Sequence, residues 1–70
     1  MTPEEESKNI YFFRYWLEAC DDDIDLADYL DVSVATIWRW REGKTPHKYM
    51  IPSIIKQLQE YVGEEYESMF

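Results

Sequence analysis

Residues 23–43, DIDLADYLDVSVATIWRWREG, constrain the fold of this chain more than any other part of the sequence. Apolar residues recur within this segment at spacings of three and four, which predicts two short amphipathic helices, residues 24–30 and 34–42. Residues 31–33 lie between the two helices and are typical of a tight turn. Because 70 residues allow one small domain, this unit is expected to supply much of the core.

The residues around the turn each suit a particular structural role. Ala27 is small enough to let two steeply crossing helices touch. Asp31 tolerates a left-handed backbone better than most non-glycine residues do, and Val32 is expected to plug the turn into the core. Ser33 is a suitable N-cap for the second helix of the unit, and Gly43 suits its end.

Buried faces are also predicted for both helices of this unit. On the first helix, either Ile24, Ala27 and Leu30 or Leu26 and Leu30 face inward, and Asp23 is the expected N-cap. On the second helix, Ile37 and Trp40 face inward.

Two further helices are predicted on either side of this unit. An earlier helix runs from a cap at Ser7 to about Cys20, after an acidic flexible lead of residues 1–6. Its predicted inward face consists of Ile10, Phe13, Leu17 and Cys20, with Trp16 alongside.

A later helix begins at Tyr49 or near Pro52 and runs to about Val62, where Gly63 is expected to end it. Its predicted buried stripe consists of Ile51, Ile54, Ile55, Leu58, Tyr61 and Val62. Tyr66, Met69 and Phe70 continue the spacing, so residues 64–70 form either a short fifth helix or an extension. The sequence thus predicts an all-α domain of four or five short helices over residues 7–63, followed by this helical extension or tail.

Charge is unevenly distributed along the chain, whose formal net charge is −8. Residues 1–31 carry ten acidic and two basic side chains, and residues 57–70 carry four acidic side chains and no basic one. Residues 32–56 instead carry five basic side chains against one acidic side chain. The local field over residues 32–56 can therefore attract anions although the whole molecule repels them.

The stretch LADYLDVSVATIWRWREGKTP resembles the helix-turn-helix of the phage Cro-repressor type. That pattern has a Leu-Ala pair, a Gly-Val-Ser-like turn, an Ile or Val within the second helix, a Trp-Glu-Gly-like end and a Pro-containing loop. The resemblance covers residues 23–58. It implies a lambda-repressor-like domain that binds double-stranded operator DNA as a cytoplasmic homodimer, in the manner of a phage or mobile-element repressor.

The resemblance also implies which side chains meet DNA. The implied base-contacting residues are Val34, Ala35, Trp38 and Arg39. Arg39 is the best placed of these to take a guanine edge, and Val34 or Ala35 suits a thymine methyl group. The implied phosphate-contacting residues are Thr36, Arg41, Lys44, Thr45, His47 and Lys48.

Two departures from the pattern support a second hypothesis. Asp31 replaces the usual glycine of the turn, and acidic residues crowd residues 21–25, where the pattern places a neutral side chain near phosphate. An acidic helix-turn-helix protein could instead bind a protein partner, as an inhibitor or antirepressor that presents carboxylates where DNA presents phosphates. Trp38, an unusually large side chain for an outward position, could serve such a contact or fold back onto the following loop.

Other classes of function find no support in the sequence. One cysteine, Cys20, allows no disulfide within the chain and is expected to be a small buried hydrophobe. No metal-ligand cluster, phosphate-binding glycine loop or pair of nucleophile and base is apparent, so neither an enzyme nor a cofactor is expected. No apolar run is long enough for a membrane span, and MTPEEESK lacks the basic-then-apolar order of a signal peptide.

Overall fold

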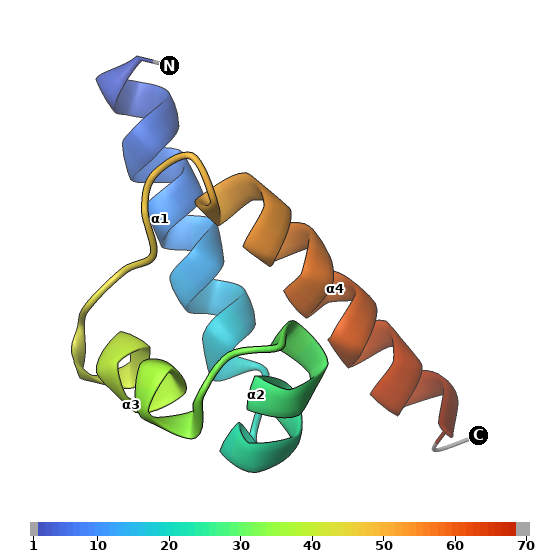
Figure 1. Ribbon diagram of the computed structural model, residues 1–70. Helices are drawn as coiled ribbons and strands as arrows, with labels where there is room; N and C mark the ends of the chain where they lie inside the picture. The colour runs from blue at the N-terminus through green and yellow to red at the C-terminus, as the bar shows by residue number, and fades with distance from the viewer. Residues whose placement is uncertain (1, 69–70) are drawn as a thin grey trace.

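The structure, a computed structural model, describes the backbone of residues 2–68 and the side chains of residues 2–64. This part of the chain is entirely helical, with α1 (Pro3–Glu18), α2 (Asp23–Leu30), α3 (Val34–Glu42) and α4 (Ile51–Ser68). Helix α1 packs along α4, and α2 contacts both α3 and α4 at one end of that pair (Figure 1). The all-α prediction is therefore confirmed, and the arrangement is compatible with a small helix-turn-helix domain.

Helix α1 begins earlier than the sequence analysis predicts. Thr2 rather than Ser7 is the N-cap, and its hydroxyl accepts a hydrogen bond from the backbone N–H of Glu5 at 3.3 Å. The Glu5 carboxylate in turn accepts from the Thr2 N–H at 3.4 Å, which completes a capping box. Pro3 occupies the first turn, where its missing N–H is not needed. Residues 3–6 are consequently helical, and the prediction of a flexible lead is wrong for them.

The turn between α2 and α3 has the geometry that its residues predict. Asp31 adopts the left-handed conformation, with φ 57° and ψ 45°. Ser33 caps α3, since its hydroxyl accepts from the Thr36 N–H at 3.1 Å. Gly43 ends α3 with φ 121°, a value that side chains disfavour. The cap of α2 is Asp22 rather than the predicted Asp23, because Asp22 Oδ1 accepts from the backbone of the third residue in the helix.

One apolar core joins the four helices. Its buried members are Phe13, Leu17, Cys20, Leu26, Ala27, Leu30, Ile37, Trp40, Ile51, Ile54, Leu58 and Tyr61. Val32 packs against them from the turn, as predicted, and Trp16, Val34, Ile55 and Val62 are partly buried around the edge.

Two predicted core residues are exposed. Ile10 of α1 is 39% exposed. Ile24 is 72% exposed, so the second of the two alternatives for α2 is correct, with Ala27 added to Leu26 and Leu30. Ile24 lies two positions from Leu26, a rotation of about 200° on an α-helix, and therefore points away from the core.

Helix α4 does not end at Gly63. The helix continues to Ser68, so residues 64–68 extend α4 and do not form a separate helix. A glycine inside a helix costs about 1 kcal/mol relative to alanine, which the long buried stripe of α4 can offset. The expectations for the side chain of Tyr66 and for Met69 and Phe70 lie outside the described residues.

Within the described residues, no helix is both long and apolar enough to cross a membrane. Those residues also contain no group of three or more His, Cys, Asp or Glu side chains that could hold a metal ion.

Candidate nucleic-acid interface

Three of the four predicted base-contacting residues are exposed on the outer face of α3. Ala35, Trp38 and Arg39 all lie on this face, and Trp38 is 57% exposed. Val34 is half-buried, because its side chain packs against the edge of the core. The indole of Trp38 is therefore presented to solvent.

Arg39 is a cation that the fold leaves available. Its guanidinium makes no hydrogen bond or ion pair with any residue that the structure describes. The neighbouring inward residues Ile37 and Trp40 anchor α3, and Trp40 meets Phe13 of α1 edge-on with ring centroids 5.4 Å apart. Arg39 thus projects from a helix whose own position is fixed by packing.

Arg41 differs from Arg39, because its guanidinium is held by hydrogen bonds and an ion pair, and its side chain is 28% exposed. Its Nη1 donates to the carbonyl of Leu17 at 2.9 Å, and its Nη2 donates to the carbonyl of Cys20. Its Nε donates to Asp23 Oδ1 at 2.9 Å, and the same carboxylate oxygen lies 2.8 Å from Nη2. Arg41 therefore caps the C-terminal end of α1, which has no basic residue of its own in its last turn.

Arg14 of α1 makes the reciprocal contact with the end of α3. Its Nη1 donates to the carbonyl of Trp40, and its Nη2 donates to the carbonyl of Lys44 at 2.7 Å. No role for Arg14 is predictable from the sequence, since nothing in its local spacing points to carbonyl groups 26 and 30 residues away. Arg41 of α3 thus caps the end of α1, and Arg14 of α1 caps the end of α3.

The loop after α3 supplies the remaining polar candidates. Lys44, Thr45, His47 and Lys48 are all exposed. The Lys48 ammonium lies 3.5 Å from Glu6 of α1 and 5.4 Å from the centroid of the Tyr49 ring. An ion pair this exposed contributes little to stability and leaves the ammonium accessible.

Two other candidate phosphate-contacting residues, His47 and Thr36, make local hydrogen bonds. Nδ1 of His47 accepts from the Tyr49 N–H at 3.3 Å. Thr36 shares a hydrogen bond of 2.9 Å with the hydroxyl of its cap, Ser33, and is half-buried.

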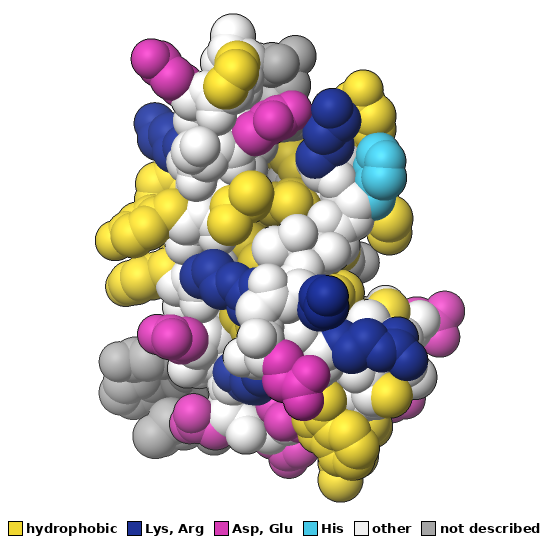
Figure 2. Space-filling model, turned by 90° about the vertical axis from the view of Figure 1, so that its left-hand side faces the viewer, with side chains coloured by type: hydrophobic (Ala, Val, Ile, Leu, Met, Phe, Trp, Pro, Cys, Tyr) yellow, Lys and Arg dark blue, Asp and Glu magenta, His cyan; other side chains and the backbone are white. Residues whose placement is uncertain are grey.

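The structure brings these cations to one side of the molecule. Figure 2 shows basic side chains crossing the middle of the face that carries α3 and the following loop, with the histidine at its edge. Acidic side chains lie among them and towards the ends of this face (Figure 2). The result is a mixed surface with a basic centre, consistent with the segregation of charge along the sequence.

Three acidic residues at the start of α2 have partners in the structure. Asp22 caps the helix, Asp23 is paired with Arg41, and Asp25 accepts a hydrogen bond from the Tyr61 hydroxyl at 2.9 Å. The repulsion expected between this region and an anionic partner is therefore reduced, because the charge of Asp23 is compensated by a cation.

Tyr29, near the end of α2, lies against α4. Its ring meets that of Tyr61 edge-on at 5.3 Å. Partial burial, together with the negative charges of Glu64 and Glu60, raises the pKa of Tyr29 above its usual value of 10.0. The phenol is therefore neutral at physiological pH, and it adds no charge to the α2–α4 contact.

No family model matches this chain, and neither a curated protein nor a solved structure matches it. The assignment of a function therefore depends on the geometry and charge described above.

Proposed function

We propose that this protein is a sequence-specific DNA-binding transcriptional regulator, a cytoplasmic repressor of the phage or mobile-element kind that acts as a homodimer. The observation that carries the proposal is the exposed, unpaired Arg39 on the outer face of α3. Helix α3 follows a turn in which Asp31 adopts a left-handed backbone where the Cro-repressor type has glycine, and Ser33 caps the helix. In that type the second helix of the unit lies in the major groove.

The side chains on α3 suit the reading of base edges. Arg39 has the planar fork of donors that pairs with O6 and N7 of guanine. Ala35 and Val34 lie one turn earlier, where a small apolar side chain can contact a thymine methyl group. Trp38 adds a broad exposed apolar surface to α3.

Phosphate contacts are proposed for the loop that follows α3. Lys44, Thr45, His47 and Lys48 are accessible there, and Thr36 lies beside the first turn of α3. Arg41 is reassigned from phosphate contact to positioning, because its guanidinium holds α3 to the end of α1. Cations of this kind would make the affinity fall as salt is added.

The proposal is tested by fluorescence anisotropy with labelled DNA from the region flanking the protein's own gene, at two salt concentrations. We expect binding that weakens with salt and that Arg39→Ala reduces by about 5- to 150-fold, the range of a lost bidentate base contact. Lys56→Ala is the matched control, since Lys56 is an exposed cation on α4 outside the interface. The proposal fails if no DNA is bound, or if both variants lose affinity equally.

A second candidate function is a protein-binding module, and one observation favours it. Ile24 and Trp38 are 72% and 57% exposed, and apolar side chains of this size are typical of protein contacts. In this case Trp38→Ala would abolish capture of a protein partner, and the anisotropy experiment would show no binding to DNA.

A further inference from the structure

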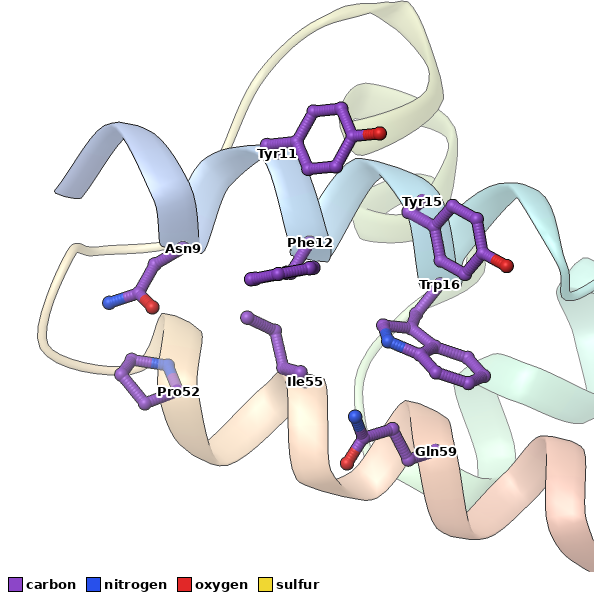
Figure 3. Close-up of a pocket in the computed structure, with 8 residues that line it drawn as sticks. All are labelled: Asn9, Tyr11, Phe12, Tyr15, Trp16, Pro52, Ile55 and Gln59. Carbon is purple, nitrogen blue, oxygen red and sulfur yellow. The ribbon is translucent and has the colours of Figure 1, made fainter. Parts of the chain in front are cut away.

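A groove of about 480 Å³ lies between α1 and α4 (Figure 3). Phe12 and Trp16 point from α1 towards α4, where Ile55 meets them, and Tyr11 and Tyr15 stand at the outer rim (Figure 3). None of the eight residues that line the groove is charged, although 31% of the chain is. The groove therefore differs in composition from the rest of the surface.

Aromatic contacts hold the rim of the groove in place. Tyr11 packs edge-on against Phe12 with ring centroids 5.7 Å apart, and Tyr15 packs in the same way against Trp16 at 5.3 Å. The two tyrosines are nevertheless 66% and 58% exposed. The rings are thus already ordered, so little conformational entropy would be lost when a ligand covers them.

The size of the groove suits a small molecule. Ligand sites in proteins have volumes of about 300–1,000 Å³ and are lined mainly by apolar and aromatic side chains with a few polar groups. Tyr11, Phe12 and Tyr15 leave about 300 Å² of aromatic surface exposed, if each ring carries roughly 200 Å². A standard protein interface buries about 800 Å² on each partner, so the groove by itself is too small to hold a protein.

The charges in and around the groove select a neutral ligand. No side chain that lines it can pair with a charged group, and burying an unpaired charge is costly. An anion is also repelled by the net charge of −8. A cation at the Phe12 ring would meet the ammonium of Lys8, which already lies 6.0 Å from the centroid of that ring.

Gln59 of α4 supplies a polar contact for such a ligand. Its side chain makes no hydrogen bond with any residue that the structure describes. The amide lies in the groove near Trp16 (Figure 3), and it can both donate and accept a hydrogen bond. A ligand with one polar group beside its rings would therefore be held in a defined orientation.

We propose that this groove binds a neutral, planar aromatic molecule that carries one hydrogen-bonding group. The rings of the ligand lie against Phe12 and Trp16 of α1 and Ile55 of α4, and its polar group meets Gln59. The groove shares no residue with the interface formed by α3 and the following loop, so this inference does not depend on the proposed function.

The test uses two fluorescent probes that share one ring system. N-Phenylnaphthylamine is neutral and carries one N–H group, and anilinonaphthalenesulfonate has the same rings with an added sulfonate. Each probe, at about 1 µM, is titrated with the full chain from about 1 µM to 1 mM, and its fluorescence rises in apolar surroundings. We expect saturable binding of the neutral probe and binding of the sulfonate that is weaker by at least about tenfold.

Variants locate the bound probe. Tyr15→Glu and Gln59→Glu each place in the groove a carboxylate that must lose hydration when a neutral ligand covers it. Each should therefore weaken binding of the neutral probe by at least about fivefold. Tyr49→Glu is the matched control, because Tyr49 is 71% exposed on the loop before α4, and it should leave the affinity unchanged. Circular dichroism checks that each variant folds.

The inference is overturned if the neutral probe shows no saturable binding below about 1 mM, or if the two probes bind equally well. Unchanged affinity in both groove variants would also overturn it, and loss of the signal in Trp38→Ala would then place the probe on α3. Binding to DNA is measured separately by anisotropy. A chain that binds the neutral probe in the groove but binds no DNA would support this inference and refute the proposed function.

Discussion

Arg14, Arg39 and Arg41 look alike in the sequence, but Arg14 and Arg41 differ from Arg39 in the fold. Both donate to carbonyl groups at the end of a neighbouring helix, and Arg41 also pairs with Asp23. The unsatisfied carbonyl groups at a helix end carry partial negative charge, which a guanidinium can neutralise through several hydrogen bonds at once. Their contribution is therefore to hold α1 and α3 together.

We predict that Arg14→Gln lowers the free energy of unfolding by about 1–3 kcal/mol, because two charge-assisted hydrogen bonds to carbonyl groups are lost. Urea denaturation followed by tryptophan fluorescence measures this change. Arg39→Gln is the control and should shift stability by less than about 0.5 kcal/mol, since a surface position without partners tolerates substitution. Equal losses in the two variants would show that the helix-end contacts of Arg14 do not contribute.

Some of the residue-scale features could be predicted from the sequence, and others could not. The left-handed Asp31 and the cap Ser33 were predictable, because turn and cap preferences depend on the residue and its immediate neighbours. The role of Arg41 was not predictable, because its acceptors belong to another helix. Its position near the basic loop instead suggested a phosphate contact.

At the scale of elements, the two glycines provide opposite cases. Gly43 ends α3 at φ 121°, whereas Gly63 lies within α4. A Cβ atom added at either position would meet nothing within 4 Å, so steric contact does not distinguish them. The difference between them is one of backbone conformation alone.

We predict that Gly43→Ala destabilises the protein by about 1–3 kcal/mol, because alanine is strained at this φ. Gly63→Ala should stabilise it by up to about 1 kcal/mol, because alanine favours the helical backbone that this position adopts. Thermal unfolding by circular dichroism compares the two variants directly. A decrease in melting temperature for Gly63→Ala would contradict the helical assignment at that position.

The boundaries of the helices were harder to predict than their existence. Thr2 and Glu5 form a capping box that was readable in the sequence, but the acidic composition of the lead favoured a flexible segment instead. Gly63 was predicted to end α4 because glycine is common after helix ends, yet the helix continues through this position to Ser68.

At the scale of the whole molecule, the excess of negative charge is the dominant feature. Fifteen acidic and seven basic side chains are distributed over a chain with a radius of gyration of 12.1 Å. Charges held this close repel one another and oppose the compact state, while unfolding separates them. The stability of the free protein should therefore depend on ionic strength.

We predict that raising NaCl from about 20 mM to 500 mM increases the melting temperature of the free protein by a few degrees, because the Debye length falls from roughly 20 Å to 4 Å. Differential scanning calorimetry at several protein concentrations separates this effect from dimer formation. An unchanged or lower melting temperature would indicate that local ion pairs, such as that of Arg41 with Asp23, outweigh the overall repulsion.

The groove of about 480 Å³ lies between α1 and α4, with Phe12 and Trp16 on one side and Ile55 on the other (Figure 3). It belongs to the scale of the whole molecule, and the sequence did not locate it. The apolar side chains of Phe12, Tyr15 and Trp16 were visible in the sequence of the first helix. The face of α4 that lies opposite them depends on how the two helices cross. Long-range packing of this kind is not encoded in the spacing of residues within one helix. The core stripe of α4 was predictable because it follows the helical repeat.

The reciprocal capping by Arg14 and Arg41 has a consequence for the arrangement of target sites. Helix α3 carries the proposed reading face, and these guanidinium contacts join it to α1 of the same chain. In a homodimer that forms through α1, the reading face of each copy is therefore fixed relative to the dimer contact. Two copies would then present their reading helices at one fixed separation and angle. Each base pair inserted between half-sites rotates them by about 35° around the DNA axis, from 10–10.5 base pairs per turn. In an operator lengthened by one base pair, the half-sites would therefore be out of phase with the two reading helices of the dimer.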